Sequence, residues 1–264
     1  MLSKRFSPWP EIWRRRELVG LLAVRTLKIR YKNATLGFVW SLLGPLFLII
    51  IYAVFLGILR FAVDLHVLIV GILVWHYLST CANDSLHAVM GNANLVRKTA
   101  FPRLILPLSM VVANTVSFLL SCLVLAVFLL LRGVVFGGEL MWLPAILLTH
   151  FAFCFGISCF VSAINVFFRD SEHLLSVALM AWFFLTPVIY PVALVLGRDL
   201  PAWMMYTYFA NPMTGIISAY RTAFLGEPFP FFRTALVSFG FAWLVLPLGI
   251  WFFQRYQVRF ADEL

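Results

Sequence analysis

Few residues of this chain have the types and spacing that chemistry requires, and the most suggestive lie in one polar stretch. Residues 91–99, GNANLVRKT, are similar to a phosphate-binding loop. Such a loop needs a second glycine directly before its lysine, so that backbone amides can surround the phosphates. Arg97 stands at that position, before Lys98. We therefore predict that the chain does not bind ATP through a loop of its own.

Acidic and metal-ligating side chains give no catalytic pattern. The five histidines are scattered without acidic residues at ligand spacing, so no zinc site is expected. Asp170 and Glu172 are interpreted as solvating a polar hinge rather than as a catalytic pair. Asp84 is a candidate because acids inside membranes are expensive and functional by default, although its place at the end of an apolar run favours an interfacial position. The sequence thus predicts no enzyme, and no cofactor or metal in this chain.

The elements that must carry these residues are membrane helices. Of the 264 residues, 63% are hydrophobic and 12% are charged, and the mean hydropathy is +0.97. Soluble domains are roughly half apolar and a quarter charged. The apolar runs reach about 20 residues, which predicts transmembrane helices rather than the ~10-residue alternating strands of a barrel. The four cysteines lie in or beside these runs and are interpreted as small buried residues.

The pattern predicts an all-α integral membrane protein with six transmembrane helices in a single domain. The six apolar runs are Leu36–Leu59, Leu65–Ala82, Leu104–Leu131, Leu140–Phe168, a fifth that begins at Leu174, and Phe231–Phe253. Together they occupy residues 36–253, between an N-terminal segment (1–35) and a short tail (254–264).

The fifth run is broken by the stretch Thr186–Pro191, TPVIYP. Proline removes a backbone donor and breaks a helix, and in hydrocarbon the freed backbone groups are tolerated only where protein or water covers them. The aromatic stretch that follows, up to Arg221, is too interrupted for another full span. We predict a re-entrant segment on the outer side, between the fifth and sixth spans. An ordinary extracellular loop with interfacial aromatic residues is the alternative.

Basic residues set the orientation. Most of the 20 Lys and Arg residues fall in the N-terminal segment, the loops after the second and fourth spans, and the tail. Both termini are therefore predicted to be cytoplasmic, and the net charge of +9 indicates topology rather than nucleic-acid binding. Leu18, Leu21, Leu22 and Ile29 share one face of a basic N-terminal helix, which is predicted to lie in the headgroup plane. A solvated basic tail is the alternative; a signal peptide is not expected, because no short apolar core is present.

A series of short motifs runs through the chain in a fixed order. It comprises RYK at 30–32, LGFVW at 36–40, GP at 44–45, NLVRK at 94–98, FPR at 101–103, LP at 106–107, RD at 169–170, TPVIYP at 186–191, NPM at 211–213 and YR at 220–221. By their order and spacing, from about Arg25 to Pro230, the chain resembles the ABC-2-type exporter permeases for polysaccharides. That family exports lipid-linked glycans such as lipopolysaccharide O antigen, capsule or teichoic acid, and O antigen is the substrate we predict.

The resemblance implies partners and a location. It implies a permease in the bacterial inner membrane that works as a homodimer with two copies of a separate subunit, which holds ATP and Mg. It also implies a coupling element for that ATP-binding subunit, comprising Asn94, Arg97, Lys98, Phe101 and Arg103, and a smaller second contact at Arg169 and Asp170. In the same picture the segment Pro187–Arg221 forms outer-side re-entrant helices over the conduit.

The chemistry of a lipid-linked glycan selects further candidates. Sugar rings present apolar faces, so a conduit should be lined with aromatic side chains that bind weakly at many points. The candidates are Tyr52, Phe55, Trp182, Phe183, Phe184 and Tyr190, and for each of them lipid contact or helix packing is the alternative. A lipid diphosphate needs Arg or Lys at the inner headgroup level. The candidates there are Arg25, Lys28, Arg30 and Lys32, with contact to anionic membrane lipids as the alternative.

Two other functions are compatible with the sequence. A permease for a drug or another small hydrophobic substrate would share the six-span plan, and the 17% aromatic content favours a glycan only mildly. A membrane-embedded glycosyl or phosphoryl transferase acting on a lipid-linked substrate would need paired acids or a metal site at the membrane face, and the sequence offers neither.

Overall fold

A computed structural model describes residues 8–30, 39–59, 64–99, 101–168, 170–197, 201–228 and 232–264, and these residues form helices and loops without any strand. The helices in chain order are α1 Pro8–Arg14, α2 Arg16–Arg30, α3 Trp40–Leu59, α4 Leu65–Leu86, η2 Met90–Asn92, α5 Ala93–Lys98, α6 Ile105–Leu131, η3 Gly138–Trp142, α7 Leu143–Phe167, α8 Ser171–Phe184, α9 Ala193–Leu196, α10 Ala202–Ala210, α11 Pro212–Leu225, α12 Phe232–Tyr256, η4 Gln257–Arg259 and α13 Phe260–Glu263. The predicted all-α class is confirmed for the described part of the chain.

Four helical stretches are long and apolar enough to cross a membrane. They are Leu65–Leu86, Ile105–Leu131, Gly138–Phe167 and Leu236–Glu263. Two shorter apolar helical stretches, Leu43–Phe55 and Ser171–Phe184, coincide with the predicted first and fifth spans. Within the described ranges the structure therefore supplies four candidate spans, and the six-span count stays a prediction.

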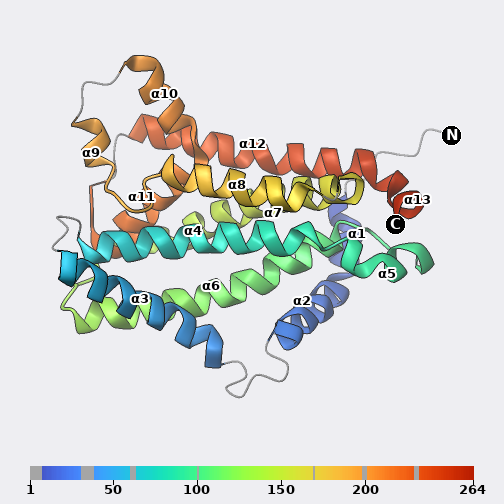
Figure 1. Cartoon of the computed structure of the whole chain (residues 1–264), viewed down its shortest axis with the longest axis horizontal. Coiled ribbons are helices and arrows are strands. Elements are labelled where there is room, and N and C mark those ends of the chain that lie inside the picture. Colours follow the sequence, from blue (N-terminus) through green and yellow to red (C-terminus); the bar gives the residue numbers. More distant parts are fainter. Residues whose placement is uncertain are drawn as a thin grey trace.

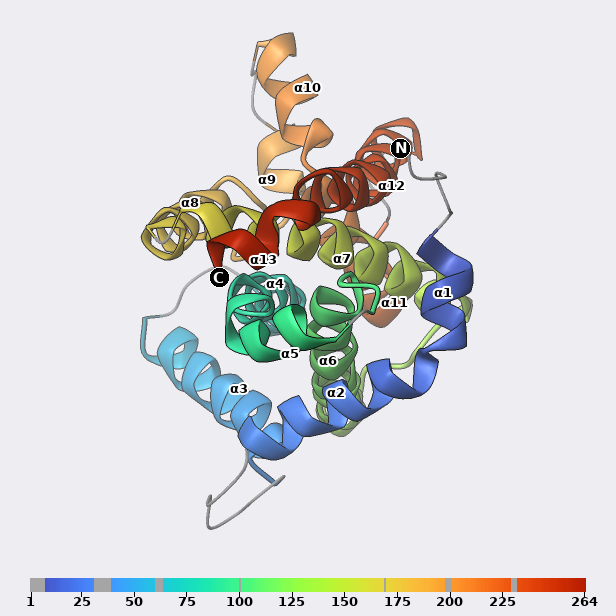
Figure 2. The same ribbon diagram turned by 90° about the vertical axis from the view of Figure 1, so that its right-hand side faces the viewer.

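The long helices run side by side around α4. In Figure 1, α4, α6, α7, α8 and α12 follow the long axis of the molecule. We call the end that carries α5 and α13 the α5 end, and the end that carries α9 and α10 the α10 end (Figure 1). Seen end-on, α4 lies in the middle, with α3, α6, α7 and α8 around it (Figure 2). This position explains why most of α4 is buried, from Val67 to Leu86.

Two glycines allow α7 and α12 to touch through their backbones. A Cβ atom added at Gly249 would lie 2.2 Å from the carbonyl oxygen of Gly156. One added at Gly156 would lie 2.7 Å from the carbonyl oxygen of Val245. Small residues let membrane helices approach this closely, since no side chain separates the backbones. The Gly156–Gly249 crossing therefore fixes α12 against the bundle.

Helix α2 lies across α6, and the bundle covers only part of the apolar face that the sequence predicts (Figure 2). Leu18 and Leu22 pack against the hydrophobic core. Leu21 and Ile29 are 68% and 59% exposed. At 3.6 residues per turn the four positions lie within about 100° of the helical circumference, so they share one side of α2, and the core covers that side only at Leu18 and Leu22.

The chain breaks after α8, as the prolines predict, and then continues as a buried helix. Asn211 begins α11, because its side-chain oxygen accepts a hydrogen bond from the backbone nitrogen of Met213 and Pro212 follows at the first helical position. Gly226 ends the helix in the left-handed conformation, with φ of 68°. Most of α11 is buried, including Arg221 near its end, so α11 is part of the core, whereas the aromatic α10 before it exposes Trp203 and Tyr206.

Candidate functional site

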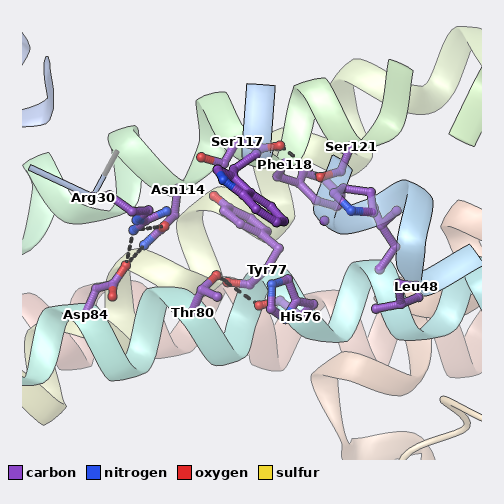
Figure 3. Close-up of a pocket in the computed structure, with 14 residues that line it drawn as sticks. Arg30, Leu48, His76, Tyr77, Thr80, Asp84, Asn114, Ser117, Phe118 and Ser121 are labelled. Carbon is purple, nitrogen blue, oxygen red and sulfur yellow. Dashed lines mark hydrogen bonds and ion pairs between the residues drawn. The ribbon is translucent and has the colours of Figure 1, made fainter. Parts of the chain in front are cut away.

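A cavity of about 460 Å³ lies between α3, α4 and α6, beside the last turn of α2 (Figure 3). We call it the inner cavity. Its walls combine aromatic and aliphatic side chains with hydroxyl, imidazole and charged groups. It is lined by Arg30, Trp40, Gly44, Pro45, Leu48, Leu73, His76, Tyr77, Thr80, Asp84, Asn114, Ser117, Phe118 and Ser121.

Helical periodicity brings the polar lining together. On α4, the residues His76, Thr80 and Asp84 recur every four positions, so they lie on one face of the helix. On α6, Asn114 and Ser117 recur at the same kind of spacing and face them across the cavity (Figure 3). Behind this polar stripe the rings of Tyr77 and Phe118 stack, with 4.6 Å between their centroids. The result is a polar stripe inside an otherwise apolar bundle.

Three side chains from three helices close one end of the inner cavity. Arg30 of α2 donates to the Asp84 carboxylate at 2.5 Å and to the Asn114 side-chain oxygen at 2.9 Å. Asn114 donates its own amide to the same Asp84 oxygen at 2.7 Å. We call this closed set of bonds the Arg30 ring. Arg30 and Asp84 are 29% and 35% exposed, so water reaches the ion pair and screens it.

The predicted conduit aromatics fall into separate groups, and none of the six is among the described residues that line the inner cavity. Trp182 and Phe183 pack edge-on against Trp75 of α4, at 5.8 and 5.7 Å between ring centroids. Phe184 is 60% exposed, and the centroid of its ring lies 5.2 Å from that of Phe183. Trp182 and Phe183 are therefore held by helix packing, whereas Phe184 faces outward from α8.

The two conduit candidates on α3 and the one in the break have different surroundings. Tyr52 packs against the core from α3, and Phe55 is 48% exposed on the same helix. Tyr190 is partly buried, and its hydroxyl lies 3.5 Å from the carbonyl oxygen of Phe184. The structure thus brings Tyr190 close to the end of α8.

A buried arginine holds the broken segment in place. Arg221 of α11 is 1% exposed, and its guanidinium donates to three backbone carbonyls: Val67 at 3.1 Å, Val188 at 2.9 Å and Tyr190 at 3.0 Å. Among the described residues, Arg221 is the side chain that donates to the carbonyl oxygens of Val188 and Tyr190. Gly71 of α4 leaves room for this contact, since a Cβ atom there would lie 2.1 Å from the Val188 oxygen. We call this arrangement the Arg221 clamp.

One asparagine completes the clamp. Asn211 accepts a hydrogen bond from the Trp182 indole at 3.0 Å and donates to the Thr186 hydroxyl at 2.8 Å. It thereby joins the end of α8, the break and the start of α11.

Glu227, which follows α11, supplies a charge opposite to that of Arg221. Burial raises the pKa of the Glu227 carboxyl above its usual range, and the charge of Arg221 opposes that rise.

The predicted coupling residues divide into an exposed set and an anchored set. Asn94, Arg97 and Lys98 of α5 are exposed at the α5 end, as is Asp170 before α8. Phe101 packs against the core. The guanidinium of Arg103 donates to the backbone carbonyl of Gln257, which ties the α5–α6 connection to the C-terminal turn. Arg169 lies outside the described residues.

The predicted headgroup residues also differ in their contacts. Arg25 reaches the side-chain oxygen of Asn92 at 3.4 Å, and Lys28 is exposed. Arg30 is engaged in the Arg30 ring. Lys32 lies outside the described residues.

Sequence reasoning missed most of the inner cavity, although a signal for it existed. The four-residue spacing of His76, Thr80 and Asp84 was readable within the second apolar run. The partner stripe on α6 was also readable, at Asn114 and Ser117. Nothing in the sequence paired these two stripes with each other, or with Arg30.

Comparisons with known proteins agree with the membrane architecture. A family model described as ABC-2 type transporter matches residues 17–225. Two proteins of Klebsiella pneumoniae, each named O-antigen export system permease protein RfbA, are 32% and 31% identical over 253 residues, which cover 94% of this chain and 95% of each relative. A protein of the same name from Myxococcus xanthus is 30% identical over 265 residues, covering 96% of this chain and 98% of the relative.

Proposed function

The chain belongs to the ABC-2 type transporter family, and we propose that it is the membrane-spanning permease subunit of an ATP-driven exporter of lipid-linked polysaccharide, with O antigen as the substrate. One observation carries the proposal: relatives named as O-antigen export permeases match this chain over 94% or more of its length. In this function the chain provides the path through the membrane, and a separate subunit binds and hydrolyses ATP.

The bundle contributes six spans in this proposal. The short apolar helices α3 and α8 join the four long candidates. Both termini and α5 face the cytoplasm. The exposed basic residues Arg97 and Lys98 at the α5 end support this orientation, because cytoplasmic loops are enriched in Lys and Arg. The α10 end then faces outward, with α9 and α10 as the re-entrant elements between spans five and six.

A second copy of the chain completes the conduit. A path wide enough for a glycan needs walls from two bundles, and we assign the second copy to the side formed by α3 and α8 (Figure 2). Large apolar side chains are exposed on both helices, such as Ile58 at 74% and Met180 at 67%. Phe55 and Phe184, which lie on the same two helices and are exposed, are the aromatic contacts that the glycan would meet there.

The ATP-binding subunit docks at the α5 end. Helix α5 supports this role because Val96 anchors it in the core while Asn94, Arg97 and Lys98 point out of the molecule. Two adjacent cations on a short anchored helix suit an acidic surface on the partner. Asp170, at the start of α8, offers the smaller second contact.

Co-purification tests the proposal. The chain is expressed with the ATP-binding subunit encoded beside it, in a strain whose own O-antigen permease has been deleted. We expect a complex of two permease and two ATP-binding subunits, and restored O antigen in the extracted lipopolysaccharide. The double variant Arg97→Ala/Lys98→Ala should lose most of the ATP-binding subunit. The matched control, Arg132→Ala, removes an exposed cation that follows α6 and should leave the complex intact. Recovery of the chain alone, without restored O antigen, would refute the exporter function.

A further inference from the structure

Three hollows meet at Asp84. The inner cavity extends along α4 from Asp84 toward Leu73. Two further hollows, of about 260 and 480 Å³, extend from Asp84 toward His87 and lie beside α2. We call these two the α2 hollows. Asp84 lines all three spaces, and Arg30 lines both the inner cavity and the larger α2 hollow. The Arg30 ring therefore lies at the partition between the α2 hollows and the inner cavity.

The α2 hollows carry charges of both signs. From α2, Arg25 lines the smaller hollow and Arg30 lines the larger one; Asp84 lines both from α4, and Glu172 lines the larger one from α8. Glu172 lies 3.6 Å from His87, which lines both. One guanidinium in each of two adjoining hollows suits a ligand with more than one phosphate, because a guanidinium binds phosphate oxygens in pairs.

The Arg30 ring also holds the last turn of α2 to the bundle. The buried residues of α2 are Val19 and Ala23, and both lie in its first half. In the second half Ile29 is exposed, and Thr26 adds one contact of 3.6 Å to a methionine sulfur of α6. Arg25 also reaches Asn92 at 3.4 Å, and the Arg30 bonds, at 2.5 and 2.9 Å, are the shorter contacts that hold the last turn over the ring.

We propose that Arg30 exchanges its Asp84 partner for the diphosphate of the lipid-linked substrate, and that this exchange opens the partition between the α2 hollows and the inner cavity. The inference rests on the proposed function, because it takes a lipid-linked diphosphate as the substrate. It adds to that function an entry step controlled by the substrate itself.

The exchange follows from the charges. The Asp84 carboxylate offers Arg30 one negative charge in a half-exposed pair, which is worth at most a small free energy. A diphosphate offers more charge and more acceptor oxygens. Once Arg30 has turned to the ligand, Asp84 faces the bound diphosphate as a like charge, and this repulsion prevents the ring from closing again. The sugar joined to the diphosphate then meets the hydroxyl of Thr80 and the amide of Asn114 in the cavity wall.

The test measures binding and opening on the purified full chain in nanodiscs of phosphatidylethanolamine. The probe is a short isoprenyl diphosphate. Opening is followed by the rate at which a polar thiol reagent labels Leu73→Cys, at a position that lines the inner cavity and is 5% exposed, in a chain that also carries Cys122→Ser. The other native cysteines, Cys81, Cys154 and Cys159, are buried. We expect the probe to accelerate labelling about tenfold, because the new thiol is buried while the ring is closed.

Two variants separate exchange from a simple structural ion pair. Asp84→Asn removes the competing charge and leaves Arg30 only a neutral amide oxygen, which weakens the ring. This variant should bind the probe about two- to fivefold more tightly. It should also be labelled rapidly without the probe. Arg30→Gln should bind the probe roughly tenfold more weakly or worse, because it loses a charge-assisted hydrogen bond. Glu172→Gln is the matched control: it removes the same charge from the larger α2 hollow without touching the ring, and should leave labelling slow.

Several results would overturn the proposal. They are unchanged or weaker binding by a folded Asp84→Asn, equal tightening by Glu172→Gln, or equal acceleration of labelling when phosphatidylglycerol replaces the probe. The last result would assign the site to anionic membrane lipids. Should Asp84→Asn fail to fold, the wild-type rates decide, because labelling that the probe does not accelerate excludes a ring opened by the substrate. None of these readings depends on O-antigen export or on the ATP-binding subunit, so failure of the proposed function would be seen separately.

Discussion

The Arg221 clamp makes the sharpest prediction about the broken segment. In Arg221→Met the aliphatic part of the side chain is kept and the guanidinium is lost. The carbonyl oxygens of Val188 and Tyr190 then have no donor among the described residues. Val67 is less affected, because it lies in the first turn of α4, where its carbonyl also accepts a helical bond.

The size of the effect follows from these two carbonyls. Leaving one buried acceptor unsatisfied costs about 1–3 kcal/mol, so two of them give about 2–6 kcal/mol. The segment can avoid this cost by moving away from α4 and exposing its carbonyls to water. Since every 1.4 kcal/mol is about tenfold, even the lower limit shifts the equilibrium toward the open segment by about 30-fold.

Cysteine labelling measures that shift. Val188 is 0% exposed, and Val188→Cys leaves the backbone carbonyl in place. A bulky polar maleimide should therefore label Val188→Cys slowly in the parent chain and at least tenfold faster when Arg221→Met is added. Gly71→Ala should have the same effect with Arg221 present, because its methyl group would lie 2.1 Å from the Val188 oxygen. Gly57→Ala, whose methyl group meets nothing within 4 Å, is the control.

The reasoning fails if the clamp is dispensable. Slow labelling of Val188→Cys in a folded Arg221→Met chain would mean that other contacts hold the segment against α4. Fast labelling with Arg221→Met but not with Gly71→Ala would mean that the arginine acts on overall folding rather than through this contact.

Three further substitutions test the packing that positions the site. Gly249→Val should abolish recovery of a monodisperse protein in size-exclusion chromatography, because any Cβ there overlaps the carbonyl of Gly156, whereas Gly240→Ala, with open space around it, should behave as the parent. Asn165→Leu breaks buried bonds to the end of α4 and the start of α8 and should lower stability by about 1–3 kcal/mol for each group left unsatisfied; an unchanged thermal midpoint would contradict this. Trp182→Phe keeps an aromatic ring packed against α4 but loses the indole donation to Asn211 at the start of α11, so we expect a loss of about 1 kcal/mol; a larger loss would mean that ring size matters more than the indole hydrogen bond.

Several features of the fold were readable in the sequence because they depend on local chemistry. The apolar runs predicted helices, and the structure has them at the predicted places within a few residues. The prolines of Thr186–Pro191 predicted a break, and α8 ends at Phe184. Arg97 and Lys98 lie in a polar stretch between two apolar runs, and α5 presents them at the surface. Each of these depends on residues adjacent in the chain.

The candidate site was only partly predictable, because its members come from distant segments. Arg30 was selected for its charge, but the sequence could not pair it with an acid 54 positions away. Asp84 was expected to reach the interface, which stays a prediction, and only the structure shows that it has two donors at the end of a cavity. Trp182 was selected as an aromatic conduit residue, and the structure shows it packed against α4 and bonded to the broken segment.

The sequence by itself determined that this chain is a bundle of apolar helices with a basic end, a broken fifth run and no catalytic pattern, since composition and periodicity suffice for such statements. Only the tertiary structure decided which groups share a partner. Arg221 joins carbonyls 154 and 33 positions away in the chain, and the Arg30 ring joins three helices. Such contacts depend on how the helices cross, and the crossing angles are set by packing over the whole bundle rather than by any local stretch.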